Sequence, residues 1–235
     1  MSSTIETVKS RLQQVQARIA AAAEAAGRPL ADISLIAVSK TRPVADLFAL
    51  QAAGQHCFGE SYVQEALVKI KAMQEPLPEW HFIGPIQSNK TRSIAESFDW
   101  VHSVSRASIA ARLNRQRPAH LPPLNICLQV NISEETAKSG CSPQQLADLA
   151  QGIRESEHLC LRGLMAVPVA SDQISVQRQS FRQLHDLYEQ LQTTLGPLDT
   201  LSMGMSNDLE AAIMEGATHV RIGTALFGPR HTRQD

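Results

Sequence analysis

The sequence has 235 residues, of which 43% are hydrophobic, and this is enough apolar material to bury a substantial core. Lysine and arginine together number 22 against 23 for aspartate and glutamate, which gives a formal net charge of −1. This balance argues against nucleic acid or a membrane surface as a partner and favours a small molecule. Because α/β barrels of this length commonly form one domain, we expect a single domain over residues 1–235.

The cysteines and the N-terminus indicate the compartment. Cys57, Cys127, Cys141 and Cys160 show no CxxC spacing and no clustering with histidine, so we expect reduced thiols and neither a metal site nor a disulfide. The N-terminus lacks a basic start followed by an apolar stretch, and no run approaches the about 20 apolar residues of a membrane span. A cytoplasmic protein is predicted.

The first segment has the periodicity of an amphipathic helix, which ends at Gly27 and Pro29. Its apolar residues recur at alternating steps of three and four: Ile5, Val8, Leu12, Val15, Ile19 and Ala23. This helix precedes the first strand, ISLIAVS, which is too short for a core helix and rich in β-branched residues.

Eight strand-like runs are predicted along the chain. They cover residues 33–39, 56–59, 80–83, 100–104, 124–130, 159–165, 199–202 and 218–222. Helix patterns lie between them, at 44–53, 62–73, 88–97, 106–116, 143–155, 174–195 and 207–215. Ser142-Pro143 and Ser206 are cap signals for two of these helices.

Strict alternation of strand and helix implies parallel strands joined by right-handed crossovers. Eight repeats are the number that closes such a sheet into a (β/α)₈ TIM barrel, here with an extra N-terminal helix. An open doubly wound sheet is the alternative.

Lys40 ends the first apolar run, where a barrel would direct it toward the mouth beside walls of low dielectric constant. Burial disfavours the ammonium form, and carbonyl chemistry requires a neutral amine. The alternative for this residue alone is a lysine that extends to solvent from a strand end.

The loops after strands seven and eight indicate a phosphate site. Gly204 allows close backbone approach, Ser202 and Ser206 offer hydroxyls, and Gly223 with Thr224 repeats that chemistry after the next strand. Phosphate sites of these barrels are frequently formed by these two loops. Ser206 is equally compatible with a plain helix cap.

A lysine on strand one and a phosphate site beside it suit an aldehyde that carries a phosphate, namely pyridoxal 5'-phosphate. Arg221, two residues before Gly223, is then placed to face the pyridine nitrogen. A cation there leaves that nitrogen unprotonated and weakens the ring as an electron sink. A structural ion pair is the alternative for Arg221.

The segments AVSKTRP, FGESYVQEA, WHFIGPIQSNK, GLMAV, SMGMSNDLEAAI and RIGTALFG resemble, in order, the pyridoxal phosphate homeostasis protein family, also called the YggS or PROSC family. The resemblance implies a fold-type-III barrel similar to the N-terminal domain of alanine racemase. It implies that Lys40 holds the cofactor as a Schiff base and that Arg221 lies near the pyridine. The phosphate neighbourhood that it implies is Ser202, Gly204, Ser206, Gly223 and Thr224.

The resemblance also implies a role in binding, buffering or delivering the cofactor, with effects on amino-acid and keto-acid balance and without established turnover. The expected partners are pyridoxal phosphate and, as recipients, apoenzymes that depend on it. One position departs from the family, which usually reads GEN where this chain has Gly59-Glu60-Ser61. This puts a contact from Ser61 in doubt.

Two enzymes are the competing hypotheses. An amino-acid racemase needs a second acid or base, which alanine racemase takes from a tyrosine of a C-terminal domain, whereas this sequence ends soon after strand eight. Low racemase activity through Lys40 is therefore the alternative to a carrier. An aldolase-type enzyme would use Lys40 on a substrate carbonyl and would be colourless, whereas a cofactor carrier would be yellow.

Three further features have less specific interpretations. His81 within an apolar strand is expected to be a hydrogen-bonded core histidine, and Lys138 is expected to be solvated, with an anionic ligand as the alternative. A monomer is expected.

Overall fold

The computed structural model describes residues 2–73, 76–133 and 139–229, with side chains from residue 6 onward. All eight predicted strands are confirmed, each within about one residue of its predicted bounds. They are β1 (Ser34–Val38), β2 (Cys57–Glu60), β3 (Glu79–Phe82), β4 (Trp100–Val104), β5 (Leu124–Gln129), β6 (Leu159–Met165), β7 (Thr200–Ser202) and β8 (His219–Ile222).

The strands form a closed parallel barrel in sequence order, which rules out the open doubly wound sheet. β1 closes the barrel against β8, with Ile36 paired to Arg221 and Ala37 to Ile222. All neighbouring strands are parallel, so the carboxyl ends of the strands lie at one end of the barrel. The turn that carries Lys40 therefore lies beside the loop that carries Gly223.

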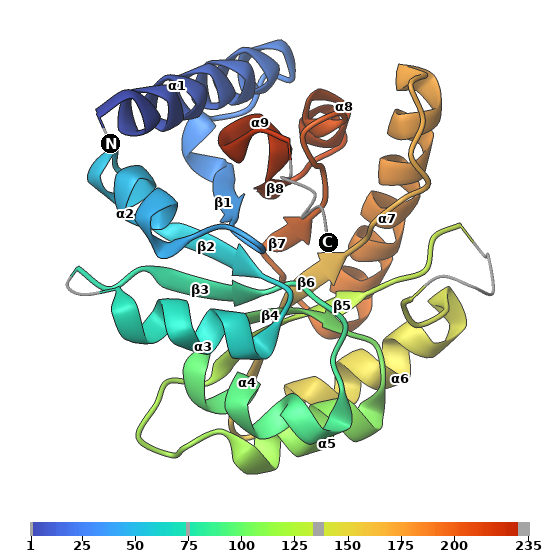
Figure 1. Cartoon of the computed structure of the whole chain (residues 1–235). Helices are drawn as coiled ribbons and strands as arrows, with labels where there is room; N and C mark the ends of the chain where they lie inside the picture. Colours follow the sequence, from blue (N-terminus) through green and yellow to red (C-terminus); the bar gives the residue numbers. More distant parts are fainter. Residues whose placement is uncertain (1, 74–75, 134–138, 230–235) are drawn as a thin grey trace.

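Helices surround the barrel, as Figure 1 shows. They are α1 (Ser2–Ala25), α2 (Val44–Ala52), α3 (Val63–Ala72), α4 (Thr91–Ser97), α5 (Ala107–Gln116), α6 (Pro143–Arg154), α7 (Ile174–Leu195), α8 (Leu209–Met214) and α9 (Thr224–Phe227), with 3₁₀ turns η1 (Leu30–Asp32) and η2 (Ser88–Lys90). The predicted extra N-terminal helix is α1, which packs on α2, α8 and α9 through a buried face that includes Leu12 and Ile19. Among the described residues, no helix has both the length and the apolar character needed to cross a bilayer.

Helix ends agree with the sequence signals in one place and depart from them in another. Ser142 caps α6 in a capping box with Gln145, as expected from the Ser-Pro signal. The helix expected over 207–215 begins only at Leu209, with Asp208 as its cap residue. Ser206 is therefore not the cap of α8, and its hydroxyl is used elsewhere.

The barrel interior differs from the layer between barrel and helices. Large aliphatic and aromatic residues fill the outer layer, whereas the interior holds Trp100, Cys127 and Met165 together with buried histidines. All four cysteines are free; Cys127 and Cys141 are buried, while Cys57 and Cys160 are half-buried. The interior is thus unusually polar for a barrel core, which is commonly filled by branched aliphatic residues.

Candidate functional site

Five of the seven predicted cofactor residues line one cavity at the carboxyl ends of the strands. The cavity has a volume of about 570 Å³, within the roughly 300–1,000 Å³ typical of small-molecule pockets. Its walls come from the turn after β1, the loop between β6 and α7, the loop after β7, and β8 with α9. The five residues are Lys40, Ser206, Arg221, Gly223 and Thr224.

Lys40 is half-buried in the turn that follows β1, and α3 holds this turn in place. The Nζ of Lys69 donates to the Ser39 carbonyl at 2.7 Å, and the Thr41 backbone N–H donates to a Glu65 carboxylate oxygen at 2.6 Å. Thr41 has a φ of 64°, a left-handed conformation that is rare for a β-branched residue. Tertiary contacts therefore keep the Lys40 turn in a conformation that its own sequence does not favour.

The group that supports this turn is a buried lysine cluster, which consists of Lys69, Glu60, Glu65 and Ser39. Lys69 is an ion-pair partner of both carboxylates, at 2.7 Å from Glu60, and the Ser39 hydroxyl donates to Glu60 at 2.6 Å. The Glu60 side chain is fully buried, and this burial raises its pKa. Lys69 supplies the positive charge that the buried Glu60 carboxylate requires.

The loops after β7 and β8 are joined at the other side of the cavity. The Ala225 backbone N–H, in the first turn of the short helix α9, donates to Ser206 Oγ at 3.2 Å. Gly223 is the cap residue of α9, and Thr224 is its first residue. Phosphate sites of such barrels commonly combine these two loops with a short extra helix, and α9 is a helix that the sequence patterns did not predict.

Arg221 reaches the cavity from inside the barrel and is 4% exposed. Its guanidinium donates to Ser202 Oγ at 2.7 Å and to the Ala166 carbonyl at 2.9 Å. Burial lowers the pKa of Arg221 to about 10, with the Asp208 carboxylate opposing this shift. The side chain therefore stays cationic at neutral pH.

The structure corrects the expected place of Ser202 and Gly204, neither of which is among the residues that line the cavity. The Ser202 side chain is fully buried, and its hydroxyl contacts both Arg221 and His102. Gly204 has a φ of 93°, and a Cβ there would lie 2.6 Å from the Ala212 Cβ on α8. Glycine at 204 thus allows a left-handed backbone and close packing of α8.

Sequence reasoning missed three charged residues of the cavity lining, Arg42, Asp172 and Asp208. The AVSKTRP motif could have indicated Arg42, whose guanidinium donates to the Pro229 carbonyl at 3.1 Å. Asp172 lies in the loop between β6 and α7 and had no sequence signal. Ser61, where the family usually has asparagine, does line the cavity, whereas Lys138 lies outside the described residues.

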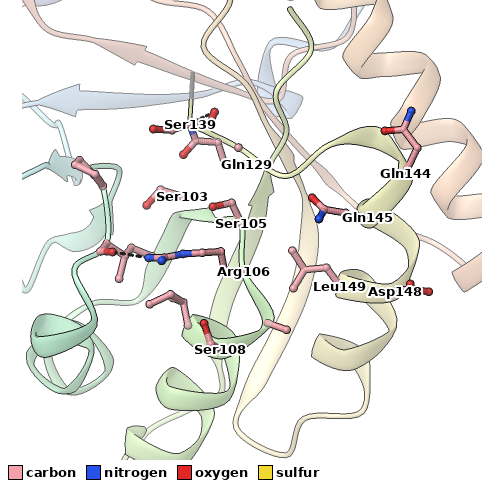
Figure 2. A pocket seen from close by; sticks show the side chains of 15 residues that line it. Ser103, Ser105, Arg106, Ser108, Gln129, Ser139, Gln144, Gln145, Asp148 and Leu149 are labelled. Atoms are coloured by element: carbon pink, nitrogen blue, oxygen red, sulfur yellow. Dashed lines mark hydrogen bonds between the residues drawn. The ribbon is translucent and has the colours of Figure 1, made fainter. Parts of the chain in front are cut away.

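A larger cavity of about 830 Å³ lies beside the ends of β4 and β5 and holds none of the predicted cofactor residues. Figure 2 shows it between the start of α5, with Ser105, Arg106 and Ser108, and the α6 residues Gln145 and Asp148. Among the residues that the structure describes, its lining contains no lysine, and Arg106 contacts the Ile86 carbonyl at 3.4 Å. Size alone would select this cavity, but the smaller one has the amine, the buried guanidinium and the hydroxyls that the predicted chemistry needs.

Comparison with known proteins places the chain in a family. The family model described as "Alanine racemase, N-terminal domain" matches residues 10–231. The chain is 56% identical over 226 residues to the "Pyridoxal phosphate homeostasis protein" of Pseudomonas aeruginosa, covering 96% of this chain and 97% of that protein. It is 50% identical over 226 residues to the protein of the same name from Escherichia coli K12, covering 95% and 97%.

Solved structures agree with these relationships. PipY of Synechococcus elongatus, with PLP bound, superposes with a TM-score of 0.82 at 34% identity, covering 94% of this chain and 100% of that one. Alanine racemase from Corynebacterium glutamicum gives a TM-score of 0.71 at 13% identity, covering 97% of this chain and 63% of that one. The second likeness concerns the fold alone.

Proposed function

The chain is a member of the pyridoxal phosphate homeostasis protein family, and from that premise we propose that it binds pyridoxal 5'-phosphate in the cavity at Lys40. Relatives that share about half of its residues over nearly their whole length are named for this role, and PipY is similar to it over 94% of the chain with PLP bound. The function is cofactor homeostasis, that is, binding, buffering or delivery of the cofactor.

The cavity suits this cofactor in size and in chemistry. Lys40 would attach the aldehyde carbon covalently, Ser206, Gly223 and Thr224 would surround the phosphate, and Arg221 would face the pyridine nitrogen. When bound, the cofactor supplies an aldehyde for the amine and a ring that can accept electrons. The permanently cationic Arg221 donates hydrogen bonds and cannot accept one, so it favours an unprotonated ring nitrogen and a weak electron sink.

One observation carries the proposal: Lys40 and the Ser206–Gly223–Thr224 loops, more than 160 positions apart in the sequence, line the same 570 Å³ cavity. Borohydride reduction of the cofactor-loaded protein, followed by peptide mapping, should find the pyridoxyl group on Lys40. Lys40→Ala should lose the adduct and the yellow colour, whereas Lys71→Ala, at an exposed lysine on α3, should keep both. An adduct elsewhere in saturated wild-type protein would refute the assignment.

We also propose that the protein acts as a carrier without efficient turnover of amino acids. Both tyrosines of the sequence lie outside the cavity lining: Tyr62 is 55% exposed, and Tyr188 is buried with its hydroxyl donating to the Leu198 carbonyl at 2.6 Å. Neither is placed as the second base that a racemase uses. Incubation with L-alanine and other L-amino acids, followed by chiral chromatography, should give no robust formation of D-enantiomer.

We propose three further properties of the protein. It delivers cofactor to apoenzymes that depend on it, it is a monomer, and it forms a single domain over residues 1–235. Four free cysteines are consistent with the reducing cytoplasm, which we propose as its location. Transfer should be tested by mixing the cofactor-loaded protein with an apoenzyme. The rate at which the apoenzyme becomes active is then compared with the rate at which the loaded protein releases cofactor into solution. Activation no faster than release would support storage over delivery.

A further inference from the structure

Four hydrogen bonds in the barrel interior join five polar residues. Arg221 contacts Ser202 Oγ at 2.7 Å, and Ser202 Oγ lies 2.8 Å from Nδ1 of His102. Nε2 of His102 lies 2.9 Å from Nδ1 of His81, whose Nε2 lies 2.9 Å from Oε1 of Glu79. These five residues are called the core network below.

The core network extends from one end of the barrel to the other. Glu79 is the first residue of β3, and its side chain is 45% exposed at the amino-terminal end of the strands. Both histidines are fully buried, and Arg221 lines the cofactor cavity at the opposite end. The bond between His102 and Ser202 crosses the interior from β4 to β7, which are not neighbours in the barrel.

With both imidazoles neutral, the chemistry of the two ends sets the direction of every hydrogen bond. Arginine has only donors, so Ser202 must accept from Arg221, and its own hydroxyl hydrogen is then available for Nδ1 of His102. A neutral His102 that accepts at Nδ1 donates from Nε2 to His81. His81 then accepts at Nδ1 and donates from Nε2 to the Glu79 carboxylate, so each contact contains one hydrogen.

The surroundings support a neutral His102 and an ionised Glu79. Burial lowers the pKa of His102 well below its ordinary value, with the positive charge of Arg221 among the further causes. The hydrogen bond from His81 lowers the pKa of Glu79 to about 2, so this carboxylate is ionised at neutral pH. His219 packs in the same interior, 6.1 Å from the His102 ring, and burial lowers its pKa to about 4.

We infer that Ser202 and His102 are positioning residues for the pyridine end of the cofactor, acting through Arg221 without touching the cofactor themselves. This inference rests on the proposed function. The network directs a lone pair of Ser202 at the guanidinium, and the Ala166 carbonyl receives a second guanidinium N–H. Two fixed acceptors hold the guanidinium in one place, while no carboxylate of the network lies close enough to neutralise it. His81 and Glu79 secure the tautomer of His102.

The first test requires no cofactor. Nitrogen-15 NMR of histidine side chains in the full chain should show His81 and His102 as neutral rings with hydrogen on Nε2 and an unprotonated, accepting Nδ1. Ser202→Ala should shift the His102 Nδ1 resonance, because that nitrogen loses its donor. A hydrogen on Nδ1 of either ring would overturn the inferred direction of the network.

The second test uses the cofactor as its own reporter. Ser202→Ala and His102→Phe should shift the visible absorption band of protein-bound cofactor and accelerate its release by about tenfold, a factor that corresponds to about 1.4 kcal/mol. Ser202→Thr retains the hydroxyl and should restore both properties. If Ser202→Ala does not fold, His102→Phe keeps an aromatic ring at this position and provides the same comparison.

The matched control is Ser103→Ala, which removes a buried hydroxyl that neighbours His102 on β4 but donates to the Gly84 carbonyl outside the network. It should leave the absorption band and the release rate unchanged. Equal changes in Ser103→Ala, or none in folded Ser202→Ala and His102→Phe with cofactor on Lys40, would overturn the inference and leave the function intact. Wild-type protein without cofactor on Lys40 after borohydride reduction would instead refute the proposed function.

Discussion

The lysine cluster beneath the Lys40 turn and the core network beneath Arg221 are both built around fully buried side chains, yet they distribute charge in opposite ways. In the lysine cluster, a cation and two carboxylates are in direct contact. In the core network, Arg221 and Glu79 are separated by a serine and two histidines. One region concentrates charge, and the other keeps its charges at opposite ends of the barrel.

This difference follows from what each region supports. Lys69 provides the counter-ion for Glu60 and Glu65 beneath the Lys40 turn, and the three side chains form one ionic cluster. Arg221 donates to two neutral acceptors, the Ser202 hydroxyl and the Ala166 carbonyl, and the Asp208 carboxylate opposes the lowering of its pKa. Neutral acceptors position the guanidinium and leave its charge directed at the cavity.

The largest loss of stability is expected from a substitution in the lysine cluster. Lys69→Met should lower the free energy of unfolding by about 3–5 kcal/mol, because Glu60 would remain buried without its ion-pair partner. Urea denaturation measures this loss, and Lys71→Met, at an exposed position on α3, should change it by no more than about 0.5 kcal/mol. The double variant Glu60→Gln/Lys69→Met should lose less than the sum of the single losses. A loss under about 1 kcal/mol for Lys69→Met would contradict the inference that Lys69 compensates the buried charge of Glu60.

A smaller loss of stability is expected from a substitution in the core network. Ser202→Ala should cost about 1–3 kcal/mol, because a buried guanidinium N–H and a buried imidazole nitrogen each lose a partner without an unpaired carboxylate being created. Urea denaturation of Ser202→Ala and Lys69→Met under the same conditions compares the two losses of stability directly. A cost for Ser202→Ala that equals or exceeds the cost for Lys69→Met would mean that the two regions do not differ in this way.

The effect that is smallest near neutral pH is a pH dependence of stability from the interior histidine His219. Because burial lowers the folded-state pKa of His219 to about 4, the unfolded chain binds more protons between about pH 6.5 and 4. Stability should therefore fall as the pH is lowered through this interval. His219→Asn should make the dependence shallower by up to about 1.4 kcal/mol per pH unit. Urea denaturation at several pH values tests this, and an unchanged slope would show that His219 is not buried in its neutral form.

Much of the fold was predictable because local patterns carry it. The eight apolar runs each identified a strand, and the spacing from Val8 to Ala23 identified the buried face of α1. The start of α8 and the four-residue α9 were not predictable, because one turn of helix has no periodicity and is decided by its neighbours. Thr41 likewise adopts its left-handed conformation only because Glu65 and Lys69 hold the turn.

The site was predictable where a motif lies at a strand end and unpredictable where side chains meet across the barrel. Motif position placed Lys40, Ser206 and Thr224 at one cavity. It misplaced Ser202, since the end of a strand and the interior below it are a single residue apart and only the pleat decides which way the side chain points.

The sequence by itself determined the order of strands and helices, the position of the lysine at the mouth and the family resemblance, because each depends on residues close together in the chain. Only the tertiary structure decided what surrounds Arg221. The contact between His102 and Ser202 joins residues 100 positions apart, and the direction of its hydrogen depends on an arginine at one end and a carboxylate at the other. Such a network exists only once the barrel has closed.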